Sequence, residues 1–181
     1  MGVLIESLTA AQARAAVPAL IEVLRDAVDS GASVGFLPPL RTETAAAYWR
    51  TVVAALQAGP RVLLVARRAD DGAIVGTAQL EPSEKDNGRH RAEVSKVLVL
   101  RAARRQGVGA SLMQALEAHA RRLGRTTLVL DTREGDSAEA LYASAGWLRV
   151  GVIPRYAERA GGGLDGSAFY YKLLDSEGRT A

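Results

Sequence analysis

The segment from Val97 to Met113 carries the clearest chemical signal in this sequence. It runs from a short apolar stretch into Gly107-Val108-Gly109, and apolar residues at helical spacing follow. The first amide groups of a helix have no partner inside it, and they carry the positive end of the helix dipole. Glycines let a bulky anion approach the backbone closely. The segment therefore predicts that the amides of Gln106–Ala110 bind a diphosphate. The flanking positive charges belong to Arg101, Arg104 and Arg105.

Two familiar nucleotide-binding loops do not fit this segment. A nucleotide P-loop needs Gly-Lys-Ser/Thr after its glycines, and none follows here. A dinucleotide-binding fingerprint needs a third glycine, which is missing. The alternative to a diphosphate site is an ordinary helix start with solvated arginines.

The elements that must position this loop follow from hydrophobic periodicity and turn residues. Strands are predicted over residues 2–8, 62–66, 74–80, 92–100, 127–130, 148–153 and 167–173. Helices are predicted from Thr9 to Ser30, from Thr42 to Gly59, from Gly107 to Leu123, and from Ser137 to a stop at Gly146. We expect Pro18 to kink or restart the first helix, because proline lacks an amide donor. The strand–helix–strand unit around residues 92–130 should be right-handed and parallel. The order predicts an α/β (α+β) fold, a sheet flanked by helices.

The strand over residues 92–100 has apolar residues on both faces at its end, which indicates burial from both sides. Strict alternation places Val94, Leu98 and Leu100 on one face, with Val97 and Val99 on the other.

Composition bounds the remaining possibilities. The chain has 181 residues, which predicts a single domain over residues 1–175 with a frayed tail over 176–181. It has no cysteine, so disulfides, thiolate nucleophiles and thiolate metal ligands are excluded. The net charge of +3 gives no reason to expect a nucleic-acid partner. We find no targeting segment and no apolar stretch of about 20 residues, so we expect a cytoplasmic protein with no membrane partner. His90 and His119 lack ligand-type spacing, and we expect no metal.

Two motifs in the right order resemble the GCN5-related N-acetyltransferase (GNAT) family. The first is Arg104-Arg105-Gln106-Gly107-Val108-Gly109 after a central strand, and the second is Tyr142 four residues before Gly146-Trp147. The order of elements also matches, so the resemblance covers nearly the whole chain. It implies a mixed, mostly antiparallel sheet of about seven strands with about four helices. One departure is Gly135, where members often have an asparagine that contacts the cofactor arm.

Within that family the chain looks most like the tabtoxin-resistance acetyltransferase branch. The residues that carry this likeness are Gly31–Phe36, Asn87-Gly88, Arg91–Val94 with Lys96, and Leu130-Asp131-Thr132.

The resemblance implies acetyl-CoA as cosubstrate, a small-molecule amine as acceptor, and a monomer or homodimer. The implied cofactor-binding residues are Leu98, Val99, Leu100, Arg104, Arg105, Gln106, Gly107, Val108, Gly109 and Ala110. Tyr142 is then the expected proton donor to the CoA thiolate, since a phenol pKa of about 10 lies slightly above that of a thiol. Glu93 and Asp131 are candidate bases for the acceptor amine. Phe36 is a candidate wall of the acceptor site.

Each of these roles has a structural alternative. Tyr142 and Phe36 could simply pack in the interior, Glu93 could face solvent, and Asp131 could cap a loop. Three other functions stay open: a protein or peptide amine acetyltransferase, a non-catalytic acyl-CoA sensor or interaction module, and a nucleic-acid binder. The last ranks lowest, because no stacking aromatics accompany the arginines.

Overall fold

The computed structural model describes residues 2–174 and confirms the predicted order of elements. The strands are β1 (Val3–Ser7), β2 (Val62–Arg68), β3 (Ile74–Pro82), β4 (Arg91–Val99), β5 (Thr127–Arg133), β6 (Leu148–Glu158) and β7 (Leu164–Leu173). The helices are α1 (Ala10–Asp29), α2 (Thr42–Ala58), α3 (Val108–Arg122) and α4 (Ala138–Ser144), with short 3-10 turns η1 (Asp86–Gly88) and η2 (Arg101–Ala103). The predicted tail, residues 176–181, lies outside the described residues.

The strands form one seven-stranded sheet in the order β1-β2-β3-β4-β5-β7-β6. Every neighbouring pair is antiparallel except β4 and β5, which are parallel. This confirms the predicted mixed α/β fold. The parallel pairing is short, since it joins only residues 91–93 to residues 127–129. Beyond Glu93 and Val129 the two strands separate, and the sheet opens at its centre.

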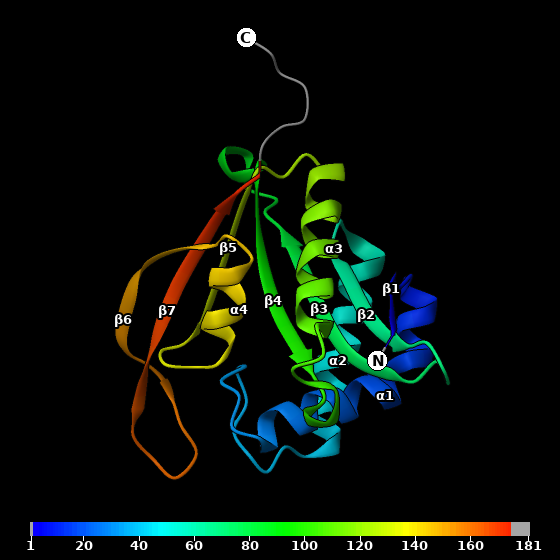
Figure 1. Ribbon diagram of the computed structural model, residues 1–181. Helices are drawn as coiled ribbons and strands as arrows, with labels where there is room; N and C mark the ends of the chain where they lie inside the picture. Colours follow the sequence, from blue (N-terminus) through cyan, green and yellow to red (C-terminus); the bar gives the residue numbers. More distant parts are fainter. Residues whose placement is uncertain (1, 175–181) are drawn as a thin grey trace.

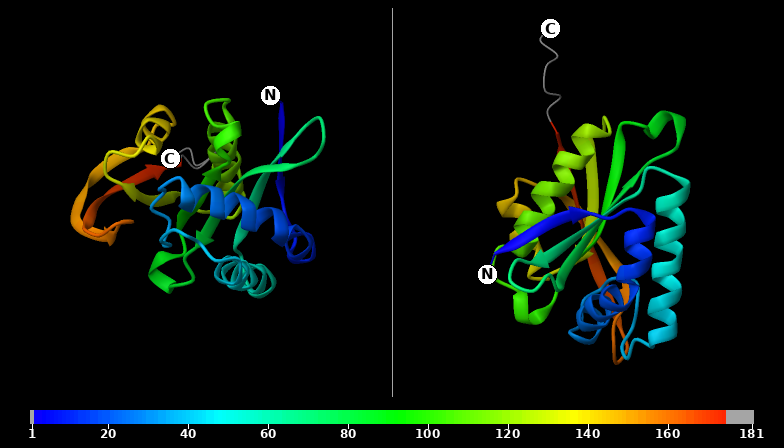
Figure 2. Two further views of the ribbon diagram at one scale, coloured as in Figure 1. Left: turned by 90° about the horizontal axis from the view of Figure 1, so that it is seen from below. Right: turned by 90° about the vertical axis from the view of Figure 1, so that its right-hand side faces the viewer.

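Helices cover the two faces of the sheet unequally (Figures 1 and 2). The helices α1 and α2 lie against one face, and α3 with α4 against the other (Figure 1). Among the described residues, no helix covers the outer strands β7 and β6 on the α1/α2 side (Figure 2). One half of that face is therefore packed, while the half beyond the central opening is uncovered.

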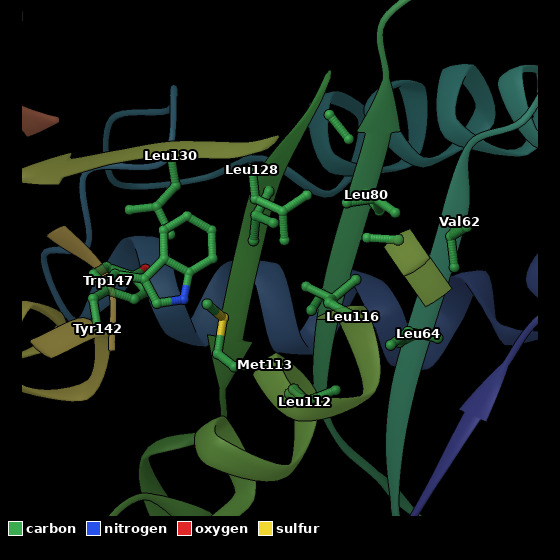
Figure 3. Close-up of a cluster of buried hydrophobic side chains, with 14 of the residues drawn as sticks. Val62, Leu64, Leu80, Leu112, Met113, Leu116, Leu128, Leu130, Tyr142 and Trp147 are labelled. Carbon is green, nitrogen blue, oxygen red and sulfur yellow. The ribbon is translucent and has the colours of Figure 1, made fainter. Parts of the chain in front are cut away.

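Each covered face has its own hydrophobic core. On the α3/α4 face, Leu112 and Leu116 of α3 pack with Leu64, Leu80 and Leu128 of the sheet (Figure 3). Tyr142 and Trp147 belong to the same cluster and lie beside Leu130 and Met113 (Figure 3). On the α1/α2 face, the wholly buried side chains include Leu20, Leu24, Trp49 and Leu63.

Local signals explain where the helices begin and end. Thr9 caps α1 in a reciprocal capping box with Gln12, which satisfies two otherwise free amide groups. Gly124 has φ +67°, the left-handed conformation predicted for the stop after α3. Pro18 lies inside α1, which continues through it as one helix rather than restarting.

The prediction about the faces of β4 is wrong, because a β-bulge interrupts the strand. Ser95 pairs with Gln79, but Leu98 pairs with Thr77, so an extra β4 residue stands between these pairs. Lys96 takes a left-handed φ of +50° at this point. As a result Val94 packs in the α3/α4 core, while Leu98 packs against the α1/α2 core.

Among the described residues, we find no helix long and apolar enough to cross a membrane.

Candidate functional site

The start of α3 presents a row of free amide groups. Gly107 is the N-cap residue, and its φ of +82° is one that a residue with a side chain rarely adopts. Among residues 2–174, the amides of Gly107, Val108, Gly109 and Ala110 donate no hydrogen bond. A Cβ at Gly107 would meet nothing within 4 Å, so the space before these amides is open. The loop and helix start therefore have the geometry of an anion site.

A cavity of about 600 Å³ lies in front of this row. Its walls come from the end of α1, from β4 beyond the bulge, from the loop before α3, and from the segment joining β5 to α4. Most of the predicted cofactor-binding residues line it, namely Leu98, Val99, Arg104, Arg105, Gly107, Val108, Gly109 and Ala110. The cavity thus reaches from the α3 amides to the separated ends of β4 and β5, where Val97 and Arg133 line it.

Leu100 and Gln106, also predicted to bind the cofactor, do not line this cavity. The amide of Leu100 donates to the carbonyl of Val75 (2.9 Å), so it is already used in pairing with β3. The side chain of Gln106 donates to the carbonyl of Ala102 (3.1 Å), which closes the turn before α3.

Arg104 is tied into the loop. Its Nε donates to the carbonyl of Val99 (3.0 Å), and Nη2 donates to Ser30 Oγ (2.8 Å). Asp26 at the end of α1 lies 3.7 Å from the same guanidinium, and it also pairs with Arg101 at 2.9 Å. These contacts fix the loop to α1. Arg105 is also exposed, but it forms no ion pair with any described residue, and it has a left-handed φ of +61°.

Sequence reasoning missed the far wall of the cavity. Arg133, at the end of β5, donates to the carbonyl of Gly31 (2.9 Å) and pairs with Asp136 at 3.3 Å. The first contact bridges β5 to the loop after α1. Arginine and aspartate after a strand carry no spacing signal of their own, so only the fold reveals this bridge.

The α1/α2 face carries a group of carboxylates beside the opening. Glu81 and Glu93 are directly opposite in the β3–β4 pairing, and Asp131 follows on β5, two residues beyond the partner of Glu93. Like charges that face each other across strands destabilise a sheet. An open hollow of about 720 Å³ adjoins them, lined by Glu81, Glu93 and Val129 among others. The structure thus brings the predicted pair Glu93 and Asp131 to one region and adds Glu81.

The carboxylates differ in their partners. Glu81 pairs with Arg61 and accepts from Ser95 Oγ (2.7 Å). Asp131 accepts from the hydroxyl of the buried Ser167 (2.6 Å). Glu93 forms no ion pair with any described residue; burial first, and then the Glu81 and Asp131 carboxylates, raise its pKa. A carboxylate with a raised pKa is suited to accept and release a proton.

Aromatic side chains border these carboxylates. The ring of Phe36 packs edge-on against Tyr48, with centroids 5.5 Å apart. The Tyr48 hydroxyl accepts from Gln79 Nε2 (2.8 Å), and Gln79 Oε1 accepts from Arg61 Nη1 (3.1 Å). Burial raises the pKa of Tyr48 to about 12, which keeps its phenol protonated. Phe36, in the loop between α1 and α2, therefore packs against the ring of Tyr48, on whose phenol the Glu81 carboxylate acts; its role as a wall of the acceptor site stays a prediction.

Tyr142 lies on α4, whose Leu141 and Ser144 line the cavity although Tyr142 itself does not. Its ring lies beside Trp147 (Figure 3). The centroid of this ring is 6.3 Å from that of Trp147 and 5.7 Å from that of Tyr170, and the residue is 6% exposed. Burial raises the pKa of this phenol, and the carboxylates of Asp136 and Asp131 raise it further. Asp136 lines the cavity, and Asp131 lies on the α1/α2 face of the sheet. Charged groups on both sides of the opening therefore act on the Tyr142 phenol.

A family model described as the acetyltransferase (GNAT) family matches residues 22–147, which is most of the chain. This chain belongs to the GNAT family of acetyltransferases. Members of this family use acetyl-CoA, and the free amides and the cavity at α3 fit a cofactor with a diphosphate.

Individual relatives agree with this assignment. An uncharacterized N-acetyltransferase in the hisH-hisA intergenic region of Azospirillum brasilense is 34% identical over 117 residues, which are 64% of this chain and 67% of that protein. A ribosomal-protein-alanine N-acetyltransferase from Brucella melitensis is 27% identical, with a TM-score of 0.76 over 94% of this chain and 99% of its own.

A third solved structure shares the fold at 22% identity. It is yncA, a putative acetyltransferase from Salmonella typhimurium with its cofactor acetyl-CoA, and it has a TM-score of 0.78 over 100% of this chain and 99% of its own.

Proposed function

We propose that this GNAT acetyltransferase moves the acetyl group of acetyl-CoA to a primary amine of a small molecule, by direct attack within a ternary complex. One arrangement supports this above all others. The cavity beside α3 and the carboxylates Glu93 and Asp131 approach the same opening between β4 and β5 from different sides. A donor and an acceptor that meet there need no covalent enzyme intermediate. We take the functional unit to be one acetyltransferase domain over residues 1–175.

The free amides of Gly107–Ala110 would hold the diphosphate, and Arg105 would add positive charge beside it. The backbone of Leu98 and Val99 would pair with the extended arm of the cofactor, since both residues line the cavity at the open edge of β4. Acetyl-CoA supplies an acetyl group activated as a thioester. A backbone N–H in this part of β4 would polarise the acetyl carbonyl.

The chain's side chains would manage the protons. An amine enters as an ammonium and must lose a proton before it can attack. Glu93 or Asp131 would accept that proton, directly or through water. Tyr142 would donate its phenolic proton to the leaving sulfur, and its raised pKa keeps that proton in place beforehand.

A peptide amine is the second candidate acceptor. The likeness to a ribosomal-protein-alanine N-acetyltransferase favours it, and so does the uncovered face of β7 and β6, which leaves room for an extended chain. The sequence resemblance to the tabtoxin-resistance branch, which we keep as a proposal, favours a small molecule. We place the small molecule first because the carboxylates lie close beside the aromatic wall formed by Phe36 and Tyr48.

Release of free CoA thiol, measured across amines and short peptides, tests the proposal. We expect turnover with at least one small amine and acetylated product by mass spectrometry. Turnover only with peptides would move the second candidate to first place. Tight acetyl-CoA binding without turnover, unchanged in Tyr142→Phe, would show a non-catalytic sensor instead.

A further inference from the structure

Lys96 is the one residue of β4 that the bulge forces into a left-handed conformation, with φ +50°. Such values are uncommon for residues with a side chain, and they cluster at functional sites. The bulge directs the ammonium towards α2, where Nζ lies 5.5 Å from the centroid of the Tyr48 ring. This distance is within the range of a cation–π contact.

The Lys96 ammonium has no anionic partner of its own. Within residues 2–174 it forms no ion pair and donates no hydrogen bond, although Glu81, Glu93 and Asp131 all lie near enough to act on it electrostatically. Burial lowers the pKa of Lys96, while the carboxylates of Glu81, Glu93 and Asp131 oppose that shift without cancelling it. A half-buried ammonium without a hydrogen-bond acceptor is costly, and an oxyanion would relieve that cost.

Two of the three neighbouring carboxylates are bound by other residues. Arg61 and Ser95 bind Glu81, and Ser167 binds Asp131. The Tyr48 ring that Lys96 contacts is itself fixed by Gln79, which is wholly buried. The Lys96 ammonium and the Glu93 carboxylate therefore lie in one region without an ion pair to any described residue.

The presence of an unpaired ammonium beside carboxylates distinguishes between possible acceptor molecules. A purely cationic amine would be attracted by Glu93 and Asp131 but repelled by Lys96. A purely anionic ligand would be repelled by the carboxylates. A molecule with an ammonium and a carboxylate a few bonds apart complements both.

We propose that Lys96 binds the carboxylate of an amino-acid acceptor, whose amino group faces Glu93 and Asp131. This inference rests on the proposed function, and it narrows the acceptor class from primary amines to amino acids. Lys96 is then a specificity-determining residue, because it selects the acceptor and takes no part in moving protons.

The test compares each common L-amino acid with its decarboxylated amine and its amide, using CoA release by wild type and Lys96→Met. We expect wild-type kcat/KM to be about tenfold higher for the best amino acid than for its decarboxylated amine. In Lys96→Met this preference should disappear, chiefly through a higher KM for the amino acid. Lys96→Arg should keep part of it.

Arg121→Met is the matched control, since it removes a positive charge from an exposed position in the last turn of α3 that lines neither the cavity nor the hollow. It should leave the preference unchanged. Equal losses for acids and amines in Lys96→Met would overturn the inference, and so would a wild-type preference for decarboxylated amines. Both outcomes leave N-acetyl transfer intact, whereas failure of the proposed function would appear as no turnover with any amine. Unchanged acetyl-CoA binding and thermal unfolding would show that Lys96→Met is folded.

Discussion

Glu81 and Glu93 lie directly opposite each other in the pairing of β3 and β4, yet within residues 2–174 only Glu81 forms an ion pair, with Arg61. The carboxylate of Glu81 is one of the causes that raise the pKa of Glu93, after burial. A sheet gains nothing from this like-charge pair. We interpret it as a device that adjusts the proton affinity of Glu93.

If Glu93 is the base, kcat/KM should rise with pH as its carboxyl ionises. Glu81→Gln should lower the pKa of Glu93, because it removes a repelling charge and frees Arg61 to act on Glu93. The acid limb of the pH profile should therefore move to lower pH. It should not reach the position of an ordinary glutamate, since burial is the largest cause and stays. An unmoved limb would assign the base to another group.

Glu93→Gln should separate activity from stability. We expect kcat to fall by about 10²-fold, the scale of a lost general base. The folded protein raises the pKa of Glu93, so it binds that proton more tightly than the unfolded chain does. The stability contributed by this group is present below the ordinary glutamate pKa of about 4.3 and is lost as pH rises through the raised value.

Thermal unfolding at two pH values therefore checks the Glu93→Gln prediction. At neutral pH the variant should melt above wild type, and the difference should vanish at acid pH. A variant that melts below wild type at neutral pH would show that ionised Glu93 stabilises the fold.

Tyr142→Phe should lower kcat by about 10²-fold and leave acetyl-CoA affinity and melting temperature near their wild-type values. The substitution keeps the ring that packs against Trp147 and Tyr170, and it removes only the acidic proton. Tyr170→Phe is the matched control. It removes a hydroxyl from a neighbouring ring of the same aromatic cluster, and that hydroxyl donates to Glu139. Steady-state kinetics should show a fall in kcat for Tyr142→Phe and a kcat near the wild-type value for Tyr170→Phe. Similar losses in both would mean that the hydroxyls act through packing.

Local sequence signals predicted the fold well. The capping residue Thr9, the left-handed Gly124 and the glycines before α3 each act through their own backbone, so their effects need no knowledge of distant contacts. The order of strands and helices followed from periodicity for the same reason. The α3 amide row was visible in the sequence because it depends on one short segment.

Features set by pairing between strands could not be predicted in this way. The bulge at Lys96 puts Val94 and Leu98 on opposite faces of the sheet, and no local sequence pattern reveals the extra residue. Glu81 joins Glu93 only through the register of β3 with β4. The contact of Arg133 with the carbonyl of Gly31 spans residues far apart in the chain.

Gly107→Ala should weaken acetyl-CoA binding more than its effect on stability explains. Alanine in a left-handed conformation costs about 1–2 kcal/mol. Gly124→Ala carries the same strain, since Gly124 also has a left-handed φ and open space for a Cβ, but it lies at the other end of α3. Both variants should melt a few degrees below wild type. Only Gly107→Ala should raise the Kd for acetyl-CoA by titration calorimetry, by about tenfold. Equal affinities in the two variants would place the diphosphate elsewhere.

Lys172 joins the elements behind Tyr142. Its ammonium donates to Glu117 of α3 (2.7 Å) and to the carbonyl of Ala145 at the end of α4 (2.6 Å). Glu117 is 8% exposed, so Lys172→Met would leave a nearly buried carboxylate without its partner. We expect the free energy of unfolding to fall by about 2–3 kcal/mol, measured by urea denaturation.

The double variant Glu117→Gln with Lys172→Met should recover part of this loss, because no unpaired charge remains. The single variant should also lower kcat more than acetyl-CoA affinity, since α4 carries Tyr142 while the amide row belongs to α3. A double variant no more stable than Lys172→Met alone would mean that the hydrogen bond to Ala145, rather than the ion pair, holds the end of α4.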